Sequence, residues 1–131
     1  MSAVRNESLE AVLAAHPEMR LVILFGSAAA GTERPDSDID IAVQADRPLD
    51  AAAKMGLIAE LAQVTGRAID LVDLCAVGEP LLAQIIKHGR RLVGSDEAYS
   101  RLITRHLVEE ADFLPYYRRL LAERRSAWIA R

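Results

Sequence analysis

Two spacings of hydrophobic positions alternate along this chain, and the alternation predicts a mixed α/β domain. Residues 7–15 (ESLEAVLAA) and 49–66 (LDAAAKMGLIAELAQVTG) carry apolar side chains at helical intervals. Between them, the short apolar runs at 20–25 (RLVILF) and 38–43 (DIDIAV) are typical of strands. A third run of this kind, RAIDLVDL at 67–74, follows the second helical segment. The pattern therefore predicts three strands with a helix between the last two.

The second half of the chain continues the alternation and ends in a long helical segment. PLLAQIIKHG at 80–89 repeats apolar residues one helical turn apart and ends at Gly89, after which RRLV predicts a short edge strand. From Asp96 onward the spacing is helical again, and Pro115 is expected to kink this helix or to begin a new one. We therefore expect an α/β fold, a small mixed sheet flanked by helices, with a C-terminal helical tail.

Composition limits the classes of protein to which the chain can belong. Its 131 residues, of which 51% are hydrophobic, suffice for one domain with its own core. The 16 basic and 19 acidic residues give a net charge of −3, so no direct nucleic-acid binding is expected. One cysteine, Cys75, excludes an internal disulfide and a cysteine zinc site. No signal-peptide or membrane-spanning pattern is present, so we expect a cytoplasmic protein without a membrane partner.

Three aspartates at alternate positions precede or enter the second predicted strand: Asp36, Asp38 and Asp40. Successive side chains of a strand point to opposite faces, so Asp38 and Asp40 share one face while Ile39 and Ile41 point into the core. Burial of a carboxylate without a partner is costly, and the pair therefore predicts a bound cation. Asp36 lies in a stretch of turn composition and is interpreted as a turn residue at the rim of this site.

A phosphate-binding turn is predicted just upstream of the aspartates. Gly26 and Ser27 follow the first strand, and SAAAG suits a short helical turn whose backbone N–H groups could receive a phosphate. Ten residues separate Ser27 from Asp38. A turn for phosphate oxygens beside two hard oxygen ligands is the arrangement that a magnesium nucleotide requires.

The stretch GSAAAGTERPDSDIDIAV resembles the signature of the DNA polymerase β-like nucleotidyltransferase superfamily, and the small size resembles its minimal nucleotidyltransferase (MNT) branch. The resemblance covers residues 20–94 and implies a polymerase β-like nucleotidyltransferase fold. It implies a minimal nucleotidyltransferase domain at 1–95 and a C-terminal helical extension at 96–131, either part of the same domain or partner-binding. Within GRAIDLVDL, it assigns the family's third carboxylate to Asp70.

The resemblance also implies roles for the site residues. Asp38 and Asp40 would hold the Mg²⁺ of the nucleotide, and Gly26 and Ser27 would bind the nucleotide itself. Asp70 would complete a second metal position and lower the effective pKa of the attacking hydroxyl, with the two ions about 3.5 to 4 Å apart. The implied substrate is ATP. All three aspartates are implied to be both catalytic residues and metal ligands.

Many members of the MNT branch are antitoxins paired with an HEPN-domain ribonuclease toxin. The implied function is that of a protein adenylyltransferase acting as a type VII-like antitoxin, which transfers AMP from ATP to a tyrosine hydroxyl of a cognate HEPN toxin within a hetero-oligomer. Many members carry an arginine in the segment that is alanine at 28–30 here. This departure favours a first alternative, a catalytically weak antitoxin that neutralises the toxin by occlusion. A second alternative, nucleotidyl transfer to a small molecule, is disfavoured because the chain has little room for a substrate domain.

The other chemically active side chains are expected to have ordinary roles. His16, His88 and His106 lack the spacing of metal ligands and are interpreted as surface or capping residues. Cys75 is expected to be a small packed side chain, because no histidine lies near it in sequence to activate a nucleophile. Asp73 falls on the strand face opposite the third carboxylate and is excluded from the site.

Basic residues gather in two places. Lys87, Arg90 and Arg91 are interpreted as a solvated face from which one side chain could reach a triphosphate. The segment 101–131 carries seven arginines against four acidic residues. An apolar stripe runs along it, and we expect the first half to pack on the sheet and the part beyond Pro115 to anchor a protein partner. The stripe consists of Ile103, Leu107, Ala111, Leu114, Tyr117, Leu121 and Trp128.

Overall fold

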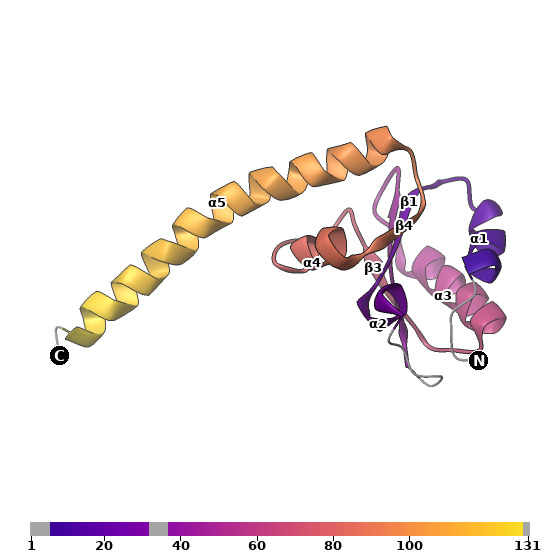
Figure 1. The fold of residues 1–131 in the computed structure, drawn as a ribbon, viewed down its shortest axis with the longest axis horizontal. Helices are drawn as coiled ribbons and strands as arrows, with labels where there is room; N and C mark the ends of the chain where they lie inside the picture. Colours follow the sequence, from indigo (N-terminus) through magenta and orange to yellow (C-terminus); the bar gives the residue numbers. More distant parts are fainter. Residues whose placement is uncertain (1–5, 32–36, 130–131) are drawn as a thin grey trace.

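The computed structural model describes residues 6–31 and 37–129, which form a four-stranded sheet with helices on both faces and one long helix extending away from it (Figure 1). The strand order is β3-β2-β1-β4. The predicted mixed sheet with flanking helices and a helical tail is confirmed. The elements in chain order are α1 (Asn6–Ala14), β1 (Met19–Phe25), α2 (Gly26–Ala30), β2 (Ile39–Ala45), α3 (Ala51–Thr65), β3 (Ile69–Asp73), α4 (Leu81–His88), β4 (Arg90–Val93) and α5 (Asp96–Ile129).

Strand pairing brings distant parts of the sequence together at one end of the strands. β1 pairs antiparallel with β2 on one side and with the edge strand β4 on the other. β2 and β3 run parallel, joined by the helix α3 as a crossover, because a parallel connection needs a long return segment. The end of β1 therefore lies beside the beginnings of β2 and β3, where the sequence places the glycine-serine turn and the carboxylates.

The ends of α3 show how local sequence sets the boundaries of a helix. The side chain of Asp50 accepts a hydrogen bond of 2.7 Å from the backbone N–H of Ala53, which satisfies one of the donors left unpaired in the first turn. Gly66 ends the helix in the left-handed conformation, with φ of 67°. Gly66 was predicted as this stop signal, and the prediction is confirmed.

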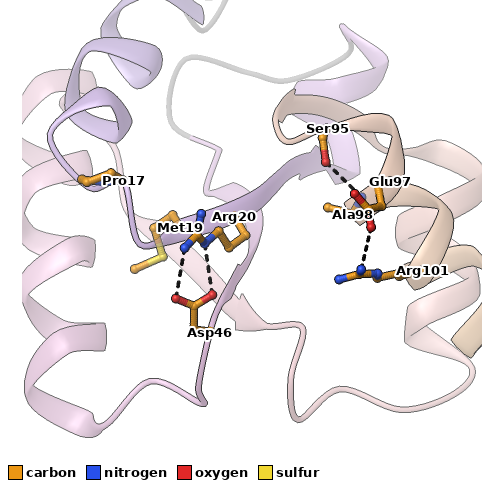
Figure 2. A pocket seen from close by; sticks show the side chains of 8 residues that line it. All are labelled: Pro17, Met19, Arg20, Asp46, Ser95, Glu97, Ala98 and Arg101. Atoms are coloured by element: carbon orange, nitrogen blue, oxygen red, sulfur yellow. Dashed lines mark hydrogen bonds and ion pairs between the residues drawn. The ribbon is translucent and has the colours of Figure 1, made fainter.

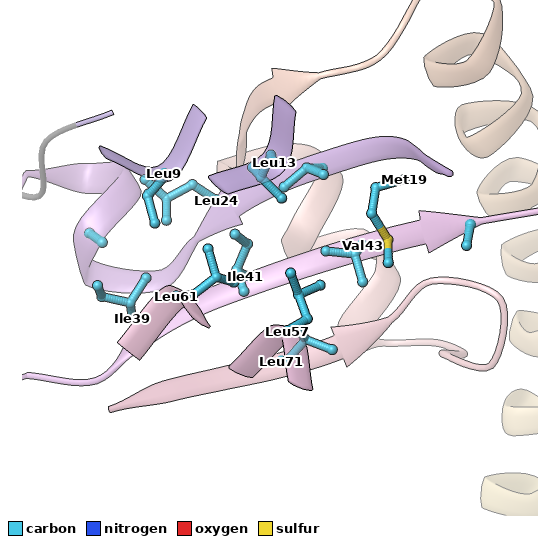
Figure 3. Close-up of a cluster of buried hydrophobic side chains, with 13 residues drawn as sticks. Leu9, Leu13, Met19, Leu24, Ile39, Ile41, Val43, Leu57, Leu61 and Leu71 are labelled. Carbon is cyan, nitrogen blue, oxygen red and sulfur yellow. The ribbon is translucent and has the colours of Figure 1, made fainter. Parts of the chain in front are cut away.

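Two hydrophobic clusters fill the two sides of the sheet. The larger one lies between the sheet and the helices α1 and α3, and Figure 3 shows Ile39, Ile41 and Val43 of β2 pointing into it. The smaller one lies under α4 and the first part of α5, and it contains Ala42 from the opposite face of β2. β2 is one of the two central strands and is covered on both faces, which explains why its sequence is a nearly continuous apolar run.

Helix α5 differs from the expected tail in two respects. It is one helix from Asp96 to Ile129 that includes Pro115, so of the two alternatives predicted for this proline, a kink or a new helix, the new helix is wrong. The helix is exposed there, where water can satisfy the carbonyl that loses its backbone donor. The predicted stripe also has the wrong register in its first half, since Leu107 is 58% exposed while Leu102 and His106 are buried.

His106 is buried because it is paired, which corrects the expectation of a surface histidine. Its Nδ1 lies 2.5 Å from a carboxylate oxygen of Glu79, and its Nε2 lies 3.2 Å from Glu110. The side chains of His106 and Glu79 are only 6% and 7% exposed. Arg105, the preceding residue, donates to the backbone carbonyl of Leu74. These contacts fix the first part of α5 against the segment that joins β3 to α4.

No helix within residues 6–31 and 37–129 combines the length and the apolar character needed to cross a bilayer.

The buried pair predicts that His106→Ala will lower the free energy of unfolding by about 1 to 3 kcal/mol, because the buried carboxylate of Glu79 loses its histidine partner and keeps only the hydrogen bond from the backbone N–H of Ala83. Urea unfolding followed by circular dichroism measures this change. The matched control is His16→Ala, which removes a more exposed histidine paired with Glu60 at 2.6 Å and Glu18 at 3.0 Å and should cost less than about 1 kcal/mol. Equal losses in the two variants would contradict the assignment of a buried pair.

Candidate active site

Two of the three predicted carboxylates lie side by side on neighbouring strands. Asp40 of β2 is directly opposite Asp70 of β3 in the parallel register, and Phe25 at the end of β1 lies opposite Asp40 on its other side. Burial raises the pKa of Asp40, and the hydrogen bond and negative charge of Asp70 raise it further. The strand pairing thus holds two acidic groups at a distance where their negative charges repel each other.

Asp38 lies just before β2, is exposed, and adds a smaller repulsion that also raises the pKa of Asp40. Within residues 6–31 and 37–129, no three His, Cys, Asp or Glu side chains form a group that could hold a metal ion. The pair of Asp40 and Asp70 nevertheless has the chemistry of a Mg²⁺ site, because it offers hard carboxylate oxygens whose repulsion a divalent cation would relieve. Asp36 lies outside the described residues.

Gly26 lies directly against the carboxylate of Asp40. It begins α2 with a φ of 69°, a conformation that favours glycine, and a Cβ atom added to it would overlap Oδ2 of Asp40. Ser27 follows in α2 and is partly buried. The sequence predicted the short helical turn, and the structure brings this turn into contact with Asp40.

A cleft of about 550 Å³ opens beside the glycine-serine turn, between α2 and α4. Sequence reasoning missed its α4 side, because nothing in the local sequence indicates that α4 lies against α2. The signal available in the sequence was the four-residue spacing of Gln84 and His88, which places both side chains on one face of α4. The cleft is lined by Phe25, Gly26, Ser27, Ala30, Leu81, Gln84 and His88.

Asp73 and Cys75 have structural contacts. The carboxylate of Asp73 accepts hydrogen bonds from the backbone N–H of Leu49 at 2.8 Å and of Cys75 at 2.9 Å, and so joins the two loops that follow β2 and β3. The Cys75 thiol contacts the carbonyl of Ala45 at 3.6 Å. Burial and the charge of Asp73 raise the pKa of this thiol, which favours its unreactive protonated form.

The basic cluster after α4 does not line the cleft. Arg91 donates to the carbonyl of Ser95 at 3.1 Å and to Asp96 at 2.8 Å, and its guanidinium lies 4.8 Å from the centre of the Tyr99 ring. Neither Arg91 nor its neighbours Lys87 and Arg90 are among the described residues that bound the cleft.

A second cleft, of about 470 Å³, lies at the opposite end of the strands, where β1 begins and β2 ends (Figure 2). Its charged side chains are paired with one another. Arg20 binds Asp46 with a shortest distance of 3.0 Å, and Arg101 binds Glu97 at 2.6 Å. The carboxylates of β2 and β3 do not line this cleft, so we place the candidate site at the other end of the strands, where β1 ends and β2 begins.

Comparison with known proteins identifies the class to which this site belongs. A family model described as "Polymerase beta, Nucleotidyltransferase" matches residues 7–98. The match extends over more than half of the chain and includes the turn, the three aspartates and α4. The chain belongs to the polymerase β nucleotidyltransferase family.

Particular relatives carry the comparison further. The chain is 40% identical over 81 residues to the protein adenylyltransferase MntA of Shewanella oneidensis, a stretch that spans 62% of this chain and 58% of MntA. It is similar over 97% of its length to 98% of a chain in the crystal structure of a toxin-antitoxin with AMP-PNP, with 30% identity and a TM-score of 0.73. A chain in the structure of a tri-AMPylated Shewanella oneidensis HEPN toxin in complex with an MNT antitoxin matches with 28% identity and a TM-score of 0.66. That match covers 95% of this chain and 93% of the other.

The contact between Gly26 and Asp40 predicts that Gly26→Ala will lower nucleotide affinity by about tenfold or more, because the added methyl group must displace the carboxylate. Isothermal titration with ATP and Mg²⁺ measures the loss. Gly31→Ala is a matched control: Gly31 has a similar φ of 73° at the other end of α2, but an added Cβ would meet no atom within 4 Å. Both variants carry the backbone strain, of about 1 to 2 kcal/mol. A loss of affinity of the same size in the control would show that backbone strain and not the contact with Asp40 is responsible.

Proposed function

We propose that this protein is a Mg²⁺-dependent adenylyltransferase that transfers AMP from ATP to a tyrosine hydroxyl of a cognate HEPN-domain toxin, and so acts as a type VII-like antitoxin. The observation that carries this proposal is the pairing of Asp40 with Asp70 on parallel strands, directly against Gly26. The similarity over 97% of the chain to a toxin-antitoxin with AMP-PNP supports both the nucleotide and the kind of partner.

In the proposed reaction, some side chains would bind the nucleotide and another would face the acceptor. Asp38 and Asp40 would hold the metal of the nucleotide, and Ser27 would donate its hydroxyl to a phosphate oxygen. Asp70 lies on the edge strand β3 and is exposed, so it would face the incoming tyrosine. Mg²⁺, when bound, would neutralise the negative charge that develops on the phosphates. Asp38 lies just before β2 and is exposed, so its carboxylate is accessible to a metal ion there.

The transfer breaks a phosphoanhydride bond of ATP and forms a phosphoester bond to the tyrosine. The tyrosine oxygen forms a bond to the α-phosphorus of ATP, and the bond from that phosphorus to the bridging oxygen of pyrophosphate breaks. Pyrophosphate leaves with the electron pair of that bond, and the phenolic proton passes to water. ATP and Mg²⁺ are cytoplasmic reagents and Cys75 has no disulfide partner, so we propose a cytoplasmic reaction.

Helix α5 provides the proposed surface for the toxin. It extends from the sheet with little of the chain packed against its second half (Figure 1). Apolar and aromatic side chains exposed along a helix are typical of an interface, and a hetero-oligomer with the toxin would cover them. Among the described side chains, the exposed large hydrophobic residues of this helix are Leu107, Val108, Leu114, Tyr116, Tyr117, Leu120 and Leu121.

The same surface supports a second candidate function, neutralisation by occlusion alone. Ala28, Ala29 and Ala30 provide no cation on α2, which favours weak catalysis, and an exposed helix of this length could block a toxin without chemistry. The two functions differ in whether the carboxylates are needed, and a substitution there separates them.

We expect Asp40→Asn and Asp70→Asn to lower AMP transfer by at least about a hundredfold, because each removes a charged ligand from the proposed metal site. Mass spectrometry of the co-expressed toxin, which gains one AMP per transfer, measures the reaction. The fold should survive in Asp40→Asn, since burial and Asp70 already raise the pKa of Asp40 and disfavour its charge. Asp50→Asn is the matched control, because asparagine caps a helix as well as aspartate does.

Growth of cells that co-express the toxin decides between the two functions. The double variant Asp38→Asn, Asp40→Asn should bind the toxin in a pull-down and fail to protect the cells. Protection at the level of the parent protein, without modification of the toxin, would refute the enzymatic mechanism and leave occlusion.

Removal of residues 115–131 should separate binding from chemistry. We expect the truncated protein to lose toxin binding by about tenfold or more, because several exposed apolar anchors are removed together. It should still bind ATP with Mg²⁺, since the sheet, the glycine-serine turn and all three aspartates precede Asp96. A pull-down and a nucleotide titration on the same preparation test both parts. Unchanged toxin binding would exclude the second half of α5 as the anchor.

A further inference from the structure

The cleft between α2 and α4 contains a histidine to which neither the family comparison nor the metal site gives a role. His88 is the last residue of α4, is exposed, and lines the cleft together with Gln84, one turn earlier. Within the described residues, His88 forms no hydrogen bond or ion pair with another side chain. An imidazole ring that can donate a hydrogen bond is therefore available to a ligand in this cleft.

The order of the strands gives the direction in which a nucleotide would enter the cleft. The transferred α-phosphate must lie at Asp40 and Asp70, on β2 and β3. β1 lies on the other side of β2, and Ser27 and then α4 follow in that direction. A triphosphate that extends from the carboxylates across Ser27 therefore places its β- and γ-phosphates in the cleft.

The lining of the cleft suits phosphate in charge and in donor groups. None of the described residues that bound it carries a carboxylate. Ser27 and Ala30 lie three residues apart on one face of α2, and they oppose Gln84 and His88 on α4. The alanine at position 30 leaves the α2 side without a long polar side chain, so side-chain contacts to the terminal phosphates beyond Ser27 would come from Gln84 and His88 on α4.

We propose that His88, assisted by Gln84, binds the β- and γ-phosphates of ATP through side-chain hydrogen bonds from the α4 side of the cleft. This inference rests on the proposed nucleotidyl transfer and names the residues that hold its leaving group. His88 contacts the pyrophosphate that leaves and not the AMP that is transferred. It therefore discriminates ATP from AMP, while the carboxylates of β2 and β3 hold the reacting phosphate.

The test compares nucleotides that differ only in their phosphates. His88→Ala should weaken binding of ATP with Mg²⁺ by about tenfold, the size expected for one hydrogen bond to a charged group, and should leave AMP binding unchanged. Isothermal titration of the full chain with ATP and with AMP measures both. Lys87→Ala is the matched control, because it removes a cation from the adjacent position, which does not line the cleft. Equal weakening of ATP binding by the two variants would show that the loss does not come from a specific contact of His88 in the cleft, and would overturn the proposal.

A second variant distinguishes a phosphate contact from a structural effect. In His88→Ala, Ala30→Arg, the arginine enters the same cleft from the α2 side and should restore ATP affinity to within about threefold of the parent protein. Failure of this rescue, or equal weakening of ATP and AMP by His88→Ala, contradicts the proposal. A second readout is the rate of AMP transfer to the toxin as a function of ATP concentration. If the parent protein transfers AMP and His88→Ala shows the same dependence on ATP concentration, this inference fails and the proposed function stands. If the parent protein binds no ATP, both fail.

Discussion

The pairing of β2 with β3 is the constraint on which the site depends. Parallel register places Asp40 against Asp70, and the crossover through α3 makes that register possible. Burial, followed by the hydrogen bond and the negative charge of Asp70, raises the pKa of Asp40, so the sheet holds the two carboxylates together at an electrostatic cost. The energy for this comes from the apolar residues of the same strand, of which Ile39, Ile41 and Val43 are fully buried on the opposite face.

The sequence predicted those parts of the structure that depend on local pattern. The alternation of apolar residues with aspartates fixed the orientation of Asp40, and Gly66 and Gly89 marked the ends of two helices. The position of Asp70 beside Asp40 required the family resemblance, since residues thirty positions apart meet only through strand pairing. The role of α4 in the cleft could not be predicted, because Gln84 and His88 differ from ordinary surface residues only once α2 lies beside them.

In helix α5, the hydrophobic pattern alone does not predict which face is buried. The predicted stripe through Leu107 and the observed buried face through Leu102 and His106 have nearly the same spacing, and hydrophobicity favoured the wrong one. His106 is buried because Glu79 pairs with it, and Glu79 comes from the distant segment between β3 and α4. A polar residue whose partner is remote in sequence is interpreted as exposed by any local rule.

The contacts at the beginning of α5 also connect the proposed binding surface to the proposed chemistry. Arg105 donates to the carbonyls of Leu74 and Val77, and His106 pairs with Glu79, so α5 holds the segment that begins one residue after the end of β3. β3 carries Asp70, the residue proposed to face the acceptor. A toxin bound along α5 would therefore be held in a fixed relation to the strand that presents Asp70. The His106–Glu79 contact is buried, so water does not compete for it as it would for a contact on the surface.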